Sequence, residues 1–212
     1  MASRLRAPLA LVLLVVAALP HALLRGEVLY GRDLVAYTYP RMQVLGEALV
    51  RGEVPRWNPW AYHGCTWFGP RAGGVVYPGH LLFGLFDPAL AMALFVAAHL
   101  LVAAEGMRRL VTRDAPGAPA TLAGVLYGLG SFHVAMYGLT PYLVSGALLP
   151  WVLHGARRAA KDAPGGLAVV GASLGLVVLA VEVQGAAMAA LCAVALGAWE
   201  GSRGGEPRRD AL

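Results

Sequence analysis

The feature that most constrains this chain is a series of long apolar stretches that are almost free of charged side chains. An α-helix needs about 20 apolar residues to cross the roughly 30 Å hydrocarbon core of a bilayer, and each stretch is near that length. The sequence therefore predicts an all-α fold, a polytopic transmembrane helical bundle with about six spans. The expected spans are residues 7–24, 88–107, 118–137, 139–156, 166–181 and 183–199.

Composition excludes the main alternatives to a membrane protein. Hydrophobic residues make up 58% of the 212 residues and charged residues only 14%, whereas soluble domains carry about 25% charged residues. Disordered chains need low hydrophobicity and high charge, so they are excluded too. The two cysteines, Cys65 and Cys192, lie far apart and provide neither a disulfide framework nor a thiolate metal site. The bilayer is therefore an expected partner, and nucleic acid is not.

Basic residues predict the orientation of the spans. Eleven of the 17 basic residues lie beside alternate span ends, which places those ends and the N-terminus in the cytoplasm. The other six lie in the loop of residues 25–79, where they count less because long segments translocate largely regardless of charge. We therefore expect a multi-pass protein whose residues 1–212 form one membrane domain, with an extracytoplasmic loop at 25–79 and a cytoplasmic tail at 200–212.

Two features of the spans leave alternatives open. The first span also resembles a signal peptide, because it has a basic start, an apolar middle and Ala18-Leu-Pro-His-Ala22 near its end. Residues 166–199 are either one long tilted helix or two short helices. The second is favoured, because one helix would place Glu182 and Gln184 at the costly centre of the bilayer.

Small residues and one proline predict how the spans pack. Gly124 with Gly128, and Gly171 with Gly175, are pairs at the spacing that lets helix backbones approach closely, although glycine is also simply frequent in membrane helices. Pro150 predicts a kink in its span, with the freed carbonyl bonded by a neighbouring side chain.

The loop of residues 25–79 differs from the rest of the chain. It holds three of the five tryptophans and five of the eight tyrosines. Within it, Met42, Leu45 and Leu49 form an apolar stripe that predicts an amphipathic helix over residues 40–51, lying in the membrane interface. Its polar side is expected to carry Arg41, Glu47 and Arg51. The aromatic side chains suit a belt at headgroup level, or a platform on which sugar rings stack.

Asp33 is the candidate catalytic residue of this loop. One interpretation is structural, because aspartate favours turns and helix N-caps. The other is functional. A carboxylate at the membrane surface, with its pKa set by a lower dielectric and by Arg32 or Arg41, can accept a proton from an attacking hydroxyl.

The order of several short motifs resembles that of a known family. After the first span come Gly31-Arg-Asp-Leu34, Tyr37, Tyr39-Pro40, Arg51-Gly-Glu-Val-Pro-Arg-Trp-Asn-Pro59, Gly64 and Tyr77-Pro78. This order is similar to the start of the YfhO-like bacterial membrane proteins, which are placed in the GT-C class of glycosyltransferases. The resemblance is clearest over residues 7–80 and continues more loosely to Glu182-Val-Gln-Gly185.

The resemblance implies transfer of a sugar from a polyprenyl-phosphate donor to an envelope glycan or polymer acceptor, outside the bacterial cytoplasmic membrane. It gives Asp33 the role of base, and it gives an arginine the role of binding the anionic lipid phosphate. Arg41, Arg56 and Arg71 are the candidates for that arginine. The other expected substrate-binding residues are Tyr37, Trp57, Asn58, His63, Tyr77 and Gln184.

Three further expectations follow from the resemblance and from the polar residues in the spans. No cofactor is expected, although a divalent metal at Asp33 and His63 stays an alternative. Family members are longer, so the chain is expected to be an N-terminal portion or truncated member that needs a C-terminal half or a partner subunit. A second function is a non-catalytic transport or envelope-assembly component. It rests on polar residues of the kind that mark translocation paths, namely Glu182, Gln184, His99 and His133.

Overall fold

The computed structural model describes residues 2–31, 33–60, 63–67 and 74–203, which form an all-α fold with one very short hairpin. In the hairpin Trp57 pairs with Thr66, and Asn58 with Cys65. The elements in chain order are α1 (Ala2–Ala18), α2 (Pro20–Arg25), the π-helix η1 (Leu34–Thr38), α3 (Tyr39–Val50), β1 (Trp57–Asn58), β2 (Cys65–Thr66), the 3₁₀-helix η2 (Pro78–Gly84), α4 (Pro88–Thr112), α5 (Ala118–Gly128), α6 (Ser131–Met136), α7 (Thr140–Ala159), α8 (Gly166–Leu179) and α9 (Val183–Arg203).

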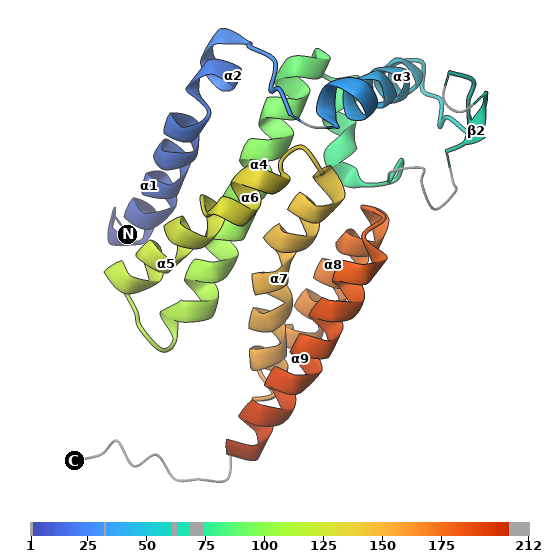
Figure 1. The fold of residues 1–212 in the computed structure, drawn as a ribbon. Helices are drawn as coiled ribbons and strands as arrows, with labels where there is room; N and C mark the ends of the chain where they lie inside the picture. Colours follow the sequence, from blue (N-terminus) through green and yellow to red (C-terminus); the bar gives the residue numbers. More distant parts are fainter. Residues whose placement is uncertain (1, 32, 61–62, 68–73, 204–212) are drawn as a thin grey trace.

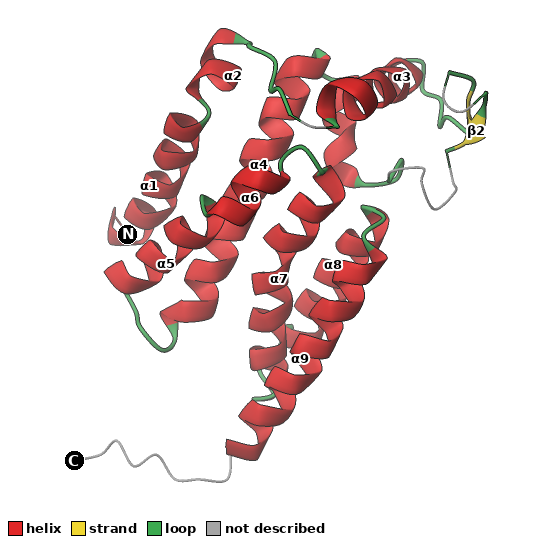
Figure 2. Cartoon of the chain, viewed as in Figure 1, coloured by secondary structure: helices red, strands yellow, loops and turns green. Residues whose placement is uncertain are grey.

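The long helices form an elongated bundle, with the segment between α2 and α4 at one end (Figure 1). Helix α4 packs against α1, α5 and α7, and α7 packs on its other side against α8 and α9. Helix α3, η2 and the hairpin lie at the end of the bundle where α7 begins, whereas the described chain ends at the opposite end (Figure 2).

Two of the described helices are long and apolar enough to cross a membrane, judged by length and composition. They are α4 and the Val183–Ser202 portion of α9. The bundle of six spans expected from the sequence is therefore not confirmed. Two expected spans are broken into shorter helices, since α1 ends at Ala18 before Pro20, and α5 ends at Gly128 before Gly130. Proline and glycine are the residues that most often interrupt a helix.

Residues 166–199 form two helices, which confirms the predicted turn and excludes one long helix. Helix α8 ends at Leu179, and α9 begins at Val183 and runs back beside it (Figure 1). The carboxylate of Glu182 accepts a hydrogen bond of 2.8 Å from the backbone N–H of Gly185. It therefore satisfies one of the free N–H groups at the start of α9.

The prediction for Pro150 is also confirmed in its hydrogen bonding. Proline has no N–H to donate, so the carbonyl of Gly146, four residues earlier, loses its partner within α7. The hydroxyl of Tyr127 on α5 donates to that carbonyl at 2.9 Å. The side chain thus ties α5 to α7 at the proline.

The two predicted glycine pairs differ in how closely they pack against a neighbouring helix. A Cβ atom on Gly124 would lie 2.6 Å from the carbonyl oxygen of Ala104, and one on Gly128 would lie 2.8 Å from that of Leu100. These glycines confirm the close packing of α5 on α4. The prediction for Gly171 and Gly175 is wrong, because both lie on the exposed face of α8 and a Cβ there would contact no described atom.

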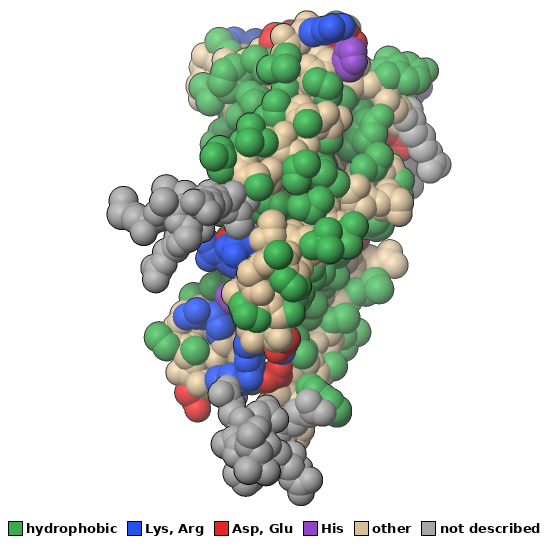
Figure 3. Space-filling model, turned by 90° about the vertical axis from the view of Figure 1, so that its left-hand side faces the viewer, with side chains coloured by type: hydrophobic (Ala, Val, Ile, Leu, Met, Phe, Trp, Pro, Cys, Tyr) green, Lys and Arg blue, Asp and Glu red, His purple; other side chains and the backbone are tan. Residues whose placement is uncertain are grey.

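Charged side chains join three helices at the end of the bundle away from α3. Glu200 on α9 forms ion pairs with Arg157 at 2.8 Å, Arg113 at 3.1 Å and Lys161 at 3.1 Å. Arg157 also binds Asp114 through two hydrogen bonds. On the face shown in Figure 3, one group of charged side chains lies at the top, the others are spread over the lower half, and the surface between them is largely apolar.

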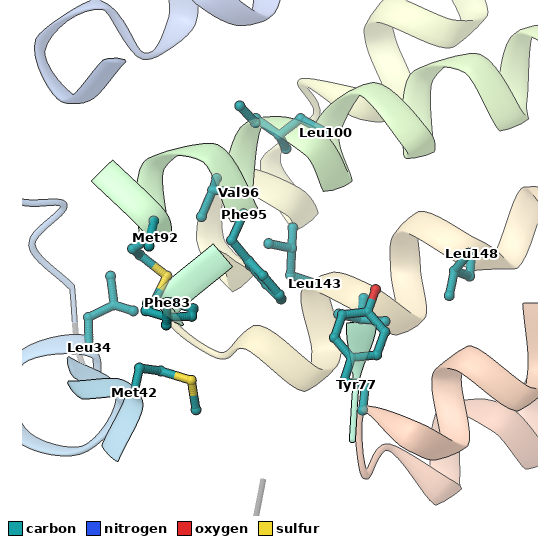
Figure 4. Close-up of a cluster of buried hydrophobic side chains, with 14 of the residues drawn as sticks. Leu34, Met42, Tyr77, Phe83, Met92, Phe95, Val96, Leu100, Leu143 and Leu148 are labelled. Atoms are coloured by element: carbon teal, nitrogen blue, oxygen red, sulfur yellow. The ribbon is translucent and has the colours of Figure 1, made fainter. Parts of the chain in front are cut away.

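One continuous core joins the bundle to residues 25–79. Leu34 from η1, Phe83 from η2 and Met92 from α4 converge in it (Figure 4). The predicted amphipathic helix is confirmed as α3, but its apolar face is not free to lie on a membrane. Met42 and Leu45 are buried, and α3 packs along η2. Described parts of the segment between the first two apolar stretches thus contribute to the folded core.

Candidate functional site

A cavity of about 610 Å³ opens where the π-helix, α3 and η2 meet the start of α7 and the turn between α8 and α9. It brings together three of the predicted site residues, Asp33, Tyr37 and Arg41. Its other lining residues are Thr38, Met42, His80, Phe95, Gly138, Leu139, Thr140, Pro141, Tyr142, Val144, Ala180 and Val181. Segments more than 140 residues apart in the sequence therefore contribute to one site.

The π-helix explains why the three predicted residues lie together. The backbone N–H groups of Tyr37 and Thr38 both donate to the carbonyl of Asp33, at 3.0 and 2.9 Å, so the first turn is widened. Helix α3 follows directly, with Pro40 in its first turn, where a missing N–H costs nothing. The spacing of four residues then places Asp33, Tyr37 and Arg41 along one side of a continuous helical segment. Short π-helical turns are frequent at functional sites.

Arg41 is buried beneath two aromatic rings, with 8% of its surface exposed. Its guanidinium donates a hydrogen bond to the hydroxyl of Tyr37. The guanidinium carbon lies 4.9 Å from the centre of the Tyr37 ring and 4.8 Å from that of Trp67. The expectation that Arg41 faces away from the apolar side of its helix is wrong, because these rings cover it. Arginine stacks well on aromatic rings and keeps its charge there, so the cavity holds a permanent cation.

The Asp33 side chain lines the cavity and is half-buried. Asp33 occupies a turn at the N-cap position of the π-helix, as the structural interpretation expects, but its side chain forms no capping hydrogen bond with the helix that follows. Within the part of the chain that the structure describes, its carboxylate has no hydrogen-bond or ion-pair partner. A carboxylate beside a cavity in this state is available to a ligand.

His80 also lines the cavity, and sequence reasoning missed it. Its Nδ1 donates to the carbonyl of Gly74 at 2.7 Å, and its ring stacks on Phe95 with centroids 5.4 Å apart. Burial lowers the pKa of His80 to about 4, and the nearby charge of Arg41 acts in the same direction, so the ring is neutral at neutral pH. The available signal was its position three residues after Tyr77, in the motif Tyr77-Pro-Gly-His80.

The shifted pKa of His80 predicts a loss of stability in mild acid. The unfolded chain takes up a proton below the ordinary pKa of 6.5, whereas the folded chain takes it up only near 4. The unfolded state thus binds more protons between these values. Stability is full above pH 6.5 and falls by about 3 kcal/mol as the pH drops to 4.

Thermal unfolding of the wild type and of His80→Asn in the same detergent, followed from pH 7.5 to 4, measures this effect. The asparagine amide can still donate to Gly74 but does not titrate. The variant is expected to lose less stability on acidification than the wild type, and parallel curves would contradict the assignment.

Tyr77 is a supporting residue and does not line the cavity. His99 donates from Nδ1 to the carbonyl of Phe95 at 2.7 Å, so its Nε2 accepts the hydroxyl proton of Tyr77 at 2.6 Å. Burial raises the pKa of Tyr77 to about 12, which keeps this hydroxyl protonated. The Tyr77 ring meets His80 edge-on, with centroids 5.4 Å apart. Tyr77 therefore packs against His80 beside the cavity, and its predicted contact with substrate stays a prediction.

The turn between α8 and α9 has a strained backbone where it lines the cavity. Val181, between α8 and α9, has φ of 65°, a left-handed conformation that β-branched residues rarely adopt. Such a conformation costs about 1–3 kcal/mol and tends to occur at functional sites. Gly74 packs against this turn, because a Cβ on Gly74 would lie 2.7 Å from the carbonyl oxygen of Leu179.

Other predicted residues lie elsewhere. Arg56 and Trp57 line a separate cleft of about 510 Å³ between α3 and the hairpin, and Trp57 is largely exposed. Asn58 is buried, and its side-chain oxygen accepts the N–H of Trp60 at 3.0 Å, as a turn residue does. His63 lies exposed in the hairpin turn and does not line the Asp33 cavity. Arg71 lies outside the described residues.

Gln184 is also separated from Asp33. It lines a third cavity, again of about 510 Å³, bounded by α5, α6, α7 and α9. Two buried polar residues, His133 and Glu182, line the same cavity. Among the described residues no group of three His, Cys, Asp or Glu side chains is arranged to hold a metal ion.

Comparison with family models, with curated proteins and with solved structures finds no match to this chain. The observed features are a helical bundle and a cavity at its end that combines a carboxylate, a buried guanidinium and a neutral imidazole. These groups are the basis for the function proposed below.

Proposed function

We propose that the chain is a GT-C-like glycosyltransferase of the bacterial cytoplasmic membrane, related to the YfhO-like proteins, or a portion of one. It transfers a sugar from a polyprenyl-phosphate donor to an envelope glycan or polymer acceptor on the extracytoplasmic side. The observation that carries the proposal is the joining of Asp33 and Arg41 in one cavity at the end of an apolar bundle. The sequence motifs that place Asp33 after the first apolar stretch support it.

The apolar surface supports a place in the membrane. Leu167, Leu191 and Val194 on α8 and α9 are each more than 70% exposed, and such side chains are compatible with lipid contact. In this arrangement α4 and α9 span the bilayer, and α7, α8 and the broken pairs α1–α2 and α5–α6 complete six passes. Helix breaks are tolerated in membranes where neighbouring side chains satisfy the backbone, as Tyr127 does at Gly146.

The charge distribution supports the orientation. The ion-pair network around Glu200 contains several of the basic residues that flank the apolar stretches, and it lies at the end of the bundle opposite α3. With this end in the cytoplasm, as the positive-inside rule requires, the Asp33 cavity opens on the extracytoplasmic side. This is the side on which envelope polymers are modified.

The chemistry of the cavity suits an inverting transfer. Asp33 accepts the proton of the acceptor hydroxyl, whose oxygen bonds to the anomeric carbon as the bond from that carbon to the phosphate oxygen breaks. Arg41 stabilises the charge that develops on the departing lipid phosphate through charge-assisted hydrogen bonds. A cavity of about 610 Å³ falls within the usual range for small-molecule sites, so it can hold a sugar phosphate headgroup.

The proposal is tested by reconstituting the purified protein in liposomes with a panel of polyprenyl-phosphate hexoses and extracted envelope glycans. Release of polyprenyl phosphate together with labelled glycan is the expected result for one donor of the panel. Absence of release with every donor would contradict the proposal, provided that a cooperative thermal unfolding transition shows the protein to be folded.

Arg41 is the arginine that we expect to bind the phosphate. Arg41→Met keeps much of the stacking volume on Tyr37 and Trp67 but removes the charge. We expect the KM for the lipid-linked sugar to rise by about 10- to 100-fold, because a hydrogen bond to a charged group contributes roughly 1.5–3 kcal/mol. Arg56→Met is the matched control, since Arg56 is exposed and lines another cleft. An equal effect of the two substitutions would contradict the role of Arg41.

A transport or envelope-assembly component is the second candidate. It is favoured by the cavity of Gln184, in which Glu182 and His133 are buried among helices that we place in the bilayer. Ionisable residues within the bilayer often mark a translocation path. His133 lies in α6, within one of the proposed passes, whereas Glu182 lies in the turn between α8 and α9, at the outer end of the bundle. This function predicts that Glu182→Gln impairs movement of a labelled lipid-linked sugar across the liposome membrane, with no effect of Asp33→Asn. Loss of sugar transfer in Asp33→Asn, with transfer intact in Glu182→Gln, supports the transferase.

A further inference from the structure

His80 has a function that the transfer mechanism above does not assign. Three aromatic rings and one hydrogen bond fix its imidazole. Phe95 stacks on it, with ring centroids 5.4 Å apart and planes inclined by 22°, and Tyr77 and Phe83 meet it edge-on. An imidazole held on several sides points its second nitrogen in one direction.

The hydrogen bond to Gly74 determines which nitrogen is free. A backbone carbonyl only accepts, so Nδ1 of His80 must carry the proton that is donated at 2.7 Å. In the neutral ring Nε2 then has a lone pair and no proton. No other described residue donates to Nε2, although His80 is one of the residues that line the Asp33 cavity. The His80 side chain is 6% exposed and lines the cavity, so a ligand bound there can donate a hydrogen bond to this unoccupied acceptor.

We propose that Nε2 of His80 accepts a hydrogen bond from a hydroxyl group of the sugar bound in the Asp33 cavity. This inference rests on the proposed function, since it names one contact of the sugar within the same site. It makes His80 a binding residue that selects and orients the hexose, next to the phosphate site of Arg41.

The neighbouring charges identify the ligand group as a neutral hydroxyl. A phosphate oxygen carries lone pairs and would be repelled by the lone pair of Nε2. A cationic group at Nε2 would be disfavoured by the charge of Arg41, which also disfavours protonation of His80, and a cation in this cavity would bind at the Asp33 carboxylate instead. A hydroxyl donates to Nε2 without either penalty. The low pKa of His80, about 4, also makes it a weak base, so proton removal stays with Asp33.

Nitrogen NMR of histidine-labelled protein in detergent tests the contact directly. The probes are polyprenyl-phosphate glucose and the same polyprenyl phosphate without sugar. The His80 spectrum is expected to show a protonated Nδ1 and an unprotonated Nε2. Addition of the sugar-bearing lipid should shift the Nε2 resonance upfield, as hydrogen bonding does, whereas the sugar-free lipid should leave it in place. Equal shifts with both lipids, or none, would overturn the proposal.

Two substitutions separate the binding contact from a structural role. His80→Asn keeps a donor for Gly74 but has no atom at the position of Nε2, whereas His80→Gln places an amide group near that position. We expect the asparagine variant to bind the glucose-bearing lipid about 5- to 10-fold more weakly, the usual effect of one neutral hydrogen bond, and the glutamine variant to recover part of this loss. Binding of the sugar-free lipid should be unchanged in both, which also shows that the site is folded.

The outcomes distinguish this inference from the proposed function. An Nε2 shift without any sugar transfer would contradict the transferase function but support the hydroxyl contact at His80. Sugar transfer without an Nε2 shift would contradict the hydroxyl contact at His80 but not the transferase function. Sugar transfer with unchanged affinity of His80→Asn for the glucose-bearing lipid would do the same. Failure of the wild type to bind either lipid would overturn both.

Discussion

Replacing Asp33 by asparagine is expected to lower the rate of sugar transfer by about 10²- to 10⁴-fold, the usual contribution of a general base. Asparagine has nearly the same shape as aspartate but cannot accept the proton of the acceptor hydroxyl. The Asp33 carboxylate makes no capping bond to the following helix, so the fold loses no contact there. The KM for the lipid-linked sugar should therefore change little, while kcat falls. Initial rates of glycan labelling in liposomes measure both.

Glu47→Gln is the matched control for this substitution. Glu47 lies on the exposed side of α3, where it accepts a hydrogen bond from Gln43, and it does not line the Asp33 cavity. Its neutralisation should leave the rate within about twofold, because an exposed surface pair contributes little. Full activity of Asp33→Asn, or an equal loss in Glu47→Gln, would contradict the role of Asp33.

Replacing Gly46 by alanine is expected to destabilise the protein by about 3 kcal/mol and to open the candidate site. A Cβ on Gly46 would lie 2.2 Å from the backbone carbonyl oxygen of Phe83, so α3 and η2 must separate. Helix α3 carries Arg41 and η2 carries His80, so their separation widens the cavity between them. Thermal unfolding in detergent measures the loss of stability, and the affinity for the lipid-linked sugar should fall with it.

Gly171→Ala is the control for the glycine substitution. Gly171 lies within α8 on an exposed face, where a new methyl group would contact no described atom. Alanine is favoured over glycine inside a helix by about 0.5–1 kcal/mol, so this variant should be equally or slightly more stable. A Gly46→Ala protein as stable as Gly171→Ala would show that α3 and η2 are not packed as described.

Much of the helical order could be predicted from the sequence because hydrophobic length and periodicity report on single helices. The helix over residues 40–51, the turn near Glu182 and the close approach at Gly124 and Gly128 all follow from local patterns, and the structure confirms them. The breaks before Pro20 and Gly130 could not be predicted, because proline and glycine are common within membrane helices and hydropathy averages over them.

The candidate site could be predicted only in part, for a physical reason. Asp33, Tyr37 and Arg41 are close in sequence, and helical spacing alone brings them to one side. His80 and Val181 reach the same cavity through tertiary packing, which no local pattern encodes. Arg41 shows the same limit. Its helix position predicts a solvent-facing side chain, but in the structure the ring of Trp67, 26 residues away, covers it.

Photocrosslinking locates the bound donor on the protein and so tests directly whether the Asp33 cavity is the donor site. A polyprenyl-phosphate hexose with a photoreactive diazirine on the sugar is added to the protein in liposomes, and the adducts after illumination are mapped by mass spectrometry. We expect adducts in residues 33–42 and 138–142, because both segments contribute residues to the lining of the Asp33 cavity. Excess unlabelled donor should suppress them. Adducts confined to residues 184–192, at the cavity of Gln184, or no saturable adduct at all, would contradict the claim.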